Sequence, residues 1–199
     1  MMRRIGWFAA TAAAAVLLLS QSGWANAGEQ GGAAGAEAAS AVAASAGDTD
    51  ALVADVSALD GLADAFMTDA DRLWVVTVRT DDRLHRWSGE DPEEAARWII
   101  ATASAVTDED PIWNVNVQGT AAPGETPASL RKRMEAEGAT LVERYEESGT
   151  YSYGYASPAF TRVARSGEHA LNVQAAAHWH TEREHWRFTL GTPAILIEY

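Results

Sequence analysis

Hydrophobic and polar residues alternate over the last thirty positions, 170–199, in a pattern that predicts a β-hairpin. The segment 171–179 has apolar residues at its odd positions and mainly polar residues at its even ones, as in a half-buried strand. The alternation resumes at 186–190, beyond a turn centred on 182–183. The cross-strand pairs expected from this turn are Trp179 with Trp186, Ala177 with Phe188, Ala175 with Leu190, His180 with His185, and His178 with Arg187.

Three earlier segments have apolar residues at helical spacing. The first, 52–66, carries a single apolar stripe. The second, 92–106, and the third, 127–137, both start with proline at the first helical position behind a side chain that can cap the helix. The residues expected to mark the helix ends are Asp50, Asp91 and Thr126 as N-caps, Val106 near the end of the second helix, and Gly138 as the last C-cap.

Short strands fill the rest of the pattern. A nearly continuous apolar run at 73–78 predicts a buried strand, and alternation at 113–118 predicts a strand whose Asn114 and Asn116 face water. The further strands are expected at 141–145, 151–155 and 160–165, with an apolar terminal strand after 191–193. Closely spaced strands leave no room for helical crossovers, so we predict an α+β fold with helices packed on an antiparallel sheet.

The N-terminus has the features of a secretory signal peptide: Arg3 and Arg4, an apolar run over 5–19 and the small-residue pattern Ala-Asn-Ala at 25–27. The run is shorter than the roughly 20 residues of a spanning helix. We therefore expect export to the outer side of the membrane and no membrane span after cleavage, with an uncleaved anchor as the alternative. The expected organisation is a signal peptide at 1–27, a flexible Ala/Gly/Ser-rich linker at 28–50 and an α+β domain at 51–199 with candidate subdomains 51–125 and 126–199.

Composition restricts the partners and the chemistry. The formal charge is −13 and becomes −15 when Arg3 and Arg4 leave with the signal peptide. Scattered arginines on such an acidic chain argue against nucleic acid as a partner. The chain contains no cysteine, which excludes disulfides and thiol catalysis, and it contains no P-loop, nucleophile elbow or dinucleotide fingerprint. No cofactor is predicted.

Four segments of the domain resemble the YwmB family of exported Gram-positive proteins. They are 172–176 (NVQAA), 189–193 (TLGTP), 197–199 (IEY) and 153–158 (YGYASP). The resemblance implies two intertwined α+β subdomains, a shape sometimes labelled TATA-box-binding-like. A label of this kind describes a fold and does not carry a function. The resemblance brings no catalytic residues to this chain.

Three histidines are the sharpest candidates for chemistry. The hairpin register places His178, His180 and His185 on one face, where imidazole nitrogens could bind Zn²⁺ or Cu²⁺. Arg187, opposite His178, would repel a cation. A solvated polar face explains the same alternation, and it is the favoured interpretation.

Aromatic residues supply the ligand-binding candidates. Tyr151, Tyr153 and Tyr155 share one strand face and could stack on sugar rings or on a peptide, or could instead pack beneath a helix. Trp87 is a candidate contact residue, or else an anchor that covers the edge of the core.

Three classes of function follow. The first, which we favour, is a non-catalytic module at the cell envelope that binds a protein, peptide or wall polymer. The second is a histidine-based metal protein. The third is an enzyme without a recognisable motif, whose sign would be a pocket holding ionisable groups with perturbed pKa values.

Overall fold

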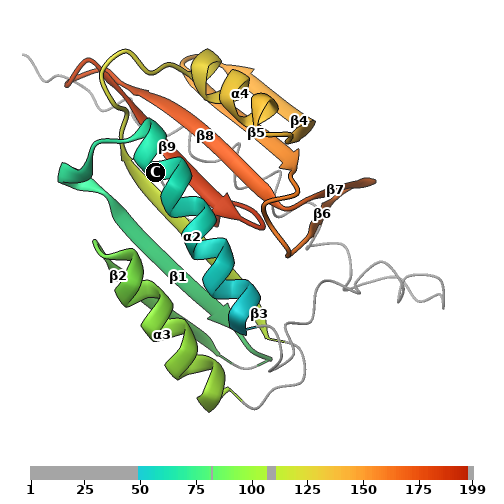
Figure 1. Cartoon of the computed structure of the whole chain (residues 1–199). Helices are drawn as coiled ribbons and strands as arrows, with labels where there is room; N and C mark the ends of the chain where they lie inside the picture. Colours follow the sequence, from blue (N-terminus) through green and yellow to red (C-terminus); the bar gives the residue numbers. More distant parts are fainter. Residues whose placement is uncertain (1–48, 82, 107–110, 197–199) are drawn as a thin grey trace, which may run out of the picture.

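The computed structural model describes residues 49–81, 83–106 and 111–196 (Figure 1). The predicted signal peptide lies outside these residues, and so does the predicted linker except for its last two positions. The helices are α2 (Thr49–Phe66), the 3-10 helix η2 (Asp69–Asp71), α3 (Pro92–Ala105) and α4 (Pro127–Ala136). The strands are β1 (Leu73–Arg79), β2 (Leu84–Gly89), β3 (Ile112–Thr120), β4 (Thr140–Glu147), β5 (Thr150–Ala156), β6 (Ala164–Ser166), β7 (His169–Leu171), β8 (Val173–His180) and β9 (His185–Thr192). None of the described helices has the length and apolarity needed to cross a membrane.

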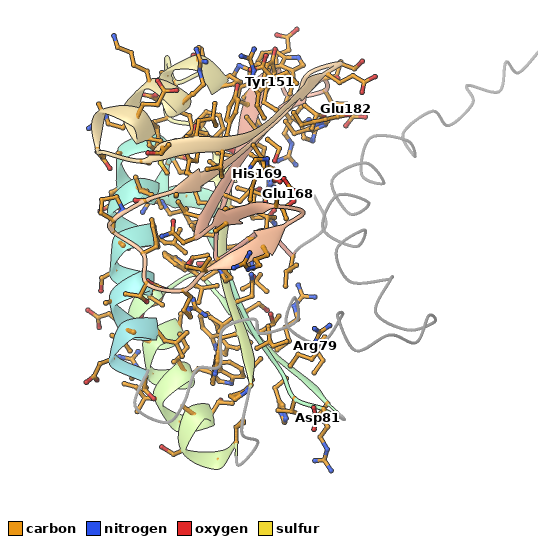
Figure 2. The ribbon with its side chains drawn as sticks, turned by 90° about the vertical axis from the view of Figure 1, so that its right-hand side faces the viewer. Arg79, Asp81, Tyr151, Glu168, His169 and Glu182 are labelled. Atoms are coloured by element: carbon orange, nitrogen blue, oxygen red, sulfur yellow. The ribbon has the colours of Figure 1, made fainter. Side chains whose placement is uncertain are left out.

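Seven strands form one antiparallel sheet in the order β2-β1-β3-β9-β8-β5-β4. Helix α3 packs on β1 and β2, α2 on β3 and β9, and α4 on β4 and β8, so the described α-helices share one face of the sheet. The separate hairpin β6–β7 projects from the other side, where Figure 2 labels Glu168 and His169. The predicted α+β class is confirmed. We call the sheet face without helices the open face.

Local signals set the helix boundaries. Asp91 caps α3 by accepting a hydrogen bond from the backbone N–H of Glu93, and Thr126 forms a capping box with Ser129 at the start of α4. Gly138 follows α4 in the left-handed conformation, with φ of 85°, as expected of a glycine behind a helix. The predicted start of α2 lay too far along the chain. This helix begins at Thr49, so Asp50 lies in its first turn instead of at its N-cap.

The C-terminal hairpin has the predicted register throughout. Trp179 pairs with Trp186, and their rings meet edge to face with centroids 5.1 Å apart. On the other face His180 pairs with His185. The turn predicted at 182–183 is observed at 181–184. Small residues of β8 oppose large residues of β9 beneath the helices, so both strands contribute to the core.

Two sequence expectations at the open face were wrong. Asn114 and Asn116 do not face water, because both are buried beneath residues 193–196. These four residues also form no strand. They follow a cis Thr192–Pro193 peptide and lie across the sheet instead of joining its edge. Residues 197–199, the rest of the predicted terminal strand, lie outside the described residues.

Strand β2 was not predicted from the sequence. β2 pairs with β1 along its whole length, although its sequence shows neither a clear apolar alternation nor an apolar run. Residues 160–163, placed in a strand by the sequence pattern, instead connect β5 to the short strand β6.

The sheet divides between the two candidate subdomains. Strands β1 to β3 come from 51–125, and strands β4, β5, β8 and β9 come from 126–199. The two sets meet where β3 pairs with β9, and their strands do not interleave. Helix α2 of the first half packs across this junction, with Phe66 edge to face on Phe188. The two halves therefore share one core.

Candidate functional site

The tyrosine candidates lie on the helix side of the sheet. Tyr153 and Tyr155 are only 1% and 0% exposed and belong to the core, whereas Tyr151 is half-buried against the ring of Trp186. Burial, together with a hydrogen bond to Glu146, raises the pKa of the Tyr153 hydroxyl. Two of the three rings are therefore packed beneath the helices, away from any surface that a ligand reaches. This is the packing alternative named from the sequence.

Trp87 lies on the edge strand β2, opposite Val76. Its ring packs against the core and covers Gly89, where an added Cβ would come within 2.6 Å of a ring carbon. The side chain is half-buried. Trp87 thus acts as an anchor for the sheet edge.

The structure brings two of the three histidines together. The rings of His180 and His185 stack with centroids 5.5 Å apart. His178 instead points toward β5, where its Nδ1 lies 3.0 Å from Thr150 Oγ1, while His185 Nε2 lies 3.4 Å from Thr120 Oγ1 on the opposite side. Within the described ranges, no three histidine or carboxylate side chains gather to hold a metal ion.

His178 belongs to a polar row that crosses five strands on the open face. Each member pairs with the next through the register of the sheet, so their side chains emerge on the same side. We call these residues the charged row: Glu147, Thr150, His178, Arg187 and Thr120. His180 and His185 form the next pair toward the β8–β9 turn, where Figure 2 labels Glu182.

Asp71, at the end of η2, closes the β3 end of the charged row. Its carboxylate accepts hydrogen bonds from the Thr120 backbone N–H at 3.0 Å and from Thr120 Oγ1 at 2.6 Å, and it lies 3.9 Å from Arg187. Burial acts to raise the pKa of Asp71, but these hydrogen bonds and the charge of Arg187 outweigh it and hold the pKa below its ordinary value. The carboxylate thus orients Thr120 and places a negative charge beside the guanidinium of Arg187.

The charged row remains accessible at its centre. The Arg187 side chain is 26% exposed and that of Asp71 is 35% exposed, and the three histidines are of intermediate exposure. Sequence reasoning missed the roles of Asp71 and Thr120. The polar alternation of β3, continued to position 120, indicates that Thr120 lies on the same face as Asn114 and Asn116. The pairing of β3 with β9, which brings Thr120 to His185, cannot be predicted from the sequence of either strand.

A hollow lies between α2 and α4 on the helix side, with a volume of about 310 Å³. Small and apolar groups line it, among them Gly61, Met134 and Phe160, and Glu137 is its one ionisable side chain. An acid–base mechanism requires at least two positioned proton-transfer groups or a positioned nucleophile. This hollow therefore offers no support for an enzyme.

No protein-family model, no curated protein and no solved structure matches this chain. The resemblance to the YwmB family therefore stays a prediction from the four segments that suggest it.

Proposed function

We propose that this chain is an exported, non-catalytic binding module of the cell envelope, similar to the YwmB family, which takes an anionic group of its ligand on the charged row. The observation that carries the proposal is the side-by-side placement of His178 and Arg187 on the open face, with the stacked pair His180 and His185 beside them. These basic groups come together on a chain with a formal charge of −13, between Glu147 and Asp71 at the two ends of the charged row.

A guanidinium group recognises carboxylate and phosphate oxygens through charge-assisted hydrogen bonds, and imidazole N–H groups can donate further hydrogen bonds to them. Asp71 lies 3.9 Å from Arg187 on one side, so a ligand anion would approach the guanidinium from the other.

The test is isothermal titration of the protein with two anionic probes, a triglutamate peptide and a short polyphosphate, which distinguish carboxylate from phosphate sources. The variant Arg187→Gln removes one charge-assisted hydrogen-bond donor, and such bonds contribute about 1.5–3 kcal/mol. We expect Kd to rise by about tenfold or more for the preferred probe. His178→Gln removes the imidazole beside Arg187 and should also weaken binding of the preferred probe.

Arg86→Gln is the matched control, because Arg86 is an exposed arginine of β2, outside the charged row. It should leave binding nearly unchanged. If neither probe binds, or if Arg187→Gln and Arg86→Gln have equal effects, the charged row is not the binding site.

A further inference from the structure

The segment formed by residues 193–196, which we call the closing segment, lies across the open face and is held there by side-chain amides. Ile195 N–H donates to Gln174 Oε1 at 3.0 Å, and Leu196 N–H donates to Asn116 Oδ1 at 3.4 Å. The carbonyl oxygen of Ala194 accepts a hydrogen bond from Asn114 Nδ2. Side chains of β3 and β8 thus form hydrogen bonds with three backbone groups of the closing segment.

This arrangement differs from strand pairing. The closing segment shares no ladder hydrogen bonds with the sheet, so its departure would leave every strand pair of the sheet intact. One side chain anchors it: Ile195 is 3% exposed, while the neighbouring Leu196 is 53% exposed. The contact therefore combines backbone recognition with a single aliphatic anchor.

The amides are held in position by other partners. Gln174 Nε2 donates to Ser152 Oγ at 2.8 Å, which turns Oε1 toward the closing segment. Asn116 Nδ2 donates to Asn114 Oδ1, which turns Asn116 Oδ1 in the same way. Because these bonds come from within the sheet, they do not depend on the closing segment. The acceptors are preorganised for backbone N–H groups.

Gly191 provides the space for this contact. It lies between Gln174 and Asn116 in the register of the sheet. A Cβ at this position would lie 2.6 Å from Asn116 Oδ1 and 2.8 Å from the carbonyl oxygen of Ala194. A glycine therefore lets a peptide backbone approach the sheet closely.

We propose that Asn114, Asn116, Gln174 and Gly191 form a docking strip for an extended peptide of a partner protein, and that the closing segment occupies this strip in the free protein. The partner peptide presents two consecutive N–H groups and the preceding carbonyl to the strip, and its aliphatic side chain takes the place of Ile195. Leaving these buried side-chain amides without hydrogen-bond partners would lower the stability of the protein. The closing segment therefore leaves only when a peptide replaces its hydrogen bonds. This site uses residues outside the charged row and does not rest on the proposed function.

The experiment measures fluorescence anisotropy of a labelled synthetic peptide with the sequence of residues 193–199. It is added to the full chain, to a chain that stops at Pro193, and to the full-length variant Ile195→Asp. An attached segment competes at a high effective concentration. We expect the two altered chains to bind the peptide at least about tenfold more tightly than the full chain does. Circular dichroism and thermal melts establish that each chain is folded.

Two controls test the recognition itself. A peptide with Asp in place of the isoleucine at position 195 should bind at least about tenfold more weakly, because it buries a charge in the aliphatic slot. Adding Gln174→Ala to either altered chain removes one acceptor and should weaken binding about threefold to tenfold. Ser57→Ala, on helix α2, is the control substitution that should have no effect.

The inference is overturned if a folded altered chain binds no peptide, or binds the Asp-containing peptide equally well. The variant Ile195→Asp keeps the test valid should the shortened chain fail to fold. Light scattering tests the remaining occupant: a full chain that dimerises by exchanging closing segments would overturn the inference and assign the strip to a second copy instead of a partner.

Discussion

Asp55 of α2 accepts a hydrogen bond from Arg162 Nε at 2.9 Å, across a sequence separation of 107 residues. Both residues are buried, at 0% and 2% exposure, and Asp55 also accepts from the backbone N–H of Thr161 at 3.1 Å. The pair ties α2 to the connection between β5 and β6. It joins the two halves of the chain outside their shared sheet.

Removing this carboxylate should be strongly destabilising. We expect Asp55→Ala to lower the free energy of unfolding by about 3–5 kcal/mol, because it takes a charged partner from a buried guanidinium. Asp64→Ala on the same helix is the control: Asp64 is 65% exposed in its ion pair with Arg72, and such pairs contribute about 0–1 kcal/mol. Urea denaturation measures both. Equal losses in the free energy of unfolding for the two variants would show that the buried pair contributes no more than the exposed one.

Two glycines should respond in opposite ways to alanine. Gly191→Ala places a Cβ against Asn116 and Ala194, so we expect a loss of about 1–3 kcal/mol in the free energy of unfolding. Gly61 lies in α2 with open space around its missing Cβ, so Gly61→Ala should add about 0.5–1 kcal/mol. Denaturant midpoints with unchanged m-values report both effects. A tolerated Gly191→Ala would contradict the close approach of the closing segment.

Two buried tyrosine hydroxyls should differ in their contributions to the stability of the protein. The Tyr153 hydroxyl donates to Glu146 at 2.8 Å, so Tyr153→Phe should cost about 0.5–1.5 kcal/mol. The Tyr155 hydroxyl is buried and finds no hydrogen-bond partner in the described part of the chain. Tyr155→Phe removes a desolvated polar group and should be neutral or stabilise the protein by up to about 1 kcal/mol. Thermal and urea unfolding of both variants measure these changes. A larger loss of stability for Tyr155→Phe than for Tyr153→Phe would contradict the prediction.

Acid should reveal the lowered pKa of Asp71. A carboxyl whose folded-state pKa lies below its unfolded value stabilises the fold above that unfolded value of 3.8, and this stability is lost as the pH falls through the folded-state pKa. Asp71→Asn should therefore have a lower Tm than the unaltered protein at neutral pH. The difference should shrink as the pH falls below 3.8.

Asp60 is the matched control of opposite sign. Its burial, with the nearby charge of Asp64, raises its pKa, so its contribution to stability is present below 3.8 and is lost as the pH rises through the folded-state pKa. Asp60→Asn should consequently raise Tm at neutral pH. Thermal melts across the acid range would refute this account if both variants shifted Tm in the same direction.

The candidate site was only partly readable from the sequence. The hairpin register placed His178, His180 and His185 on one face correctly, because a two-period alternation and one turn determine it. The same alternation in β5 correctly put Tyr151, Tyr153 and Tyr155 on one face but did not say which face the helices cover. That choice depends on the packing of α4, which a strand pattern does not contain.

The sequence by itself determined what neighbouring residues decide: the caps of α3 and α4, the glycine behind α4 and the pairing of β8 with β9. These features rest on hydrogen bonds and apolar periodicity within a few residues or across one turn. Only the tertiary structure decided that β3 pairs with β9, that Asp71 and Thr120 join the charged row, and that the closing segment buries Asn114 and Asn116. Each of these depends on contacts between distant segments, where the winning partner is selected by the packing of the whole sheet.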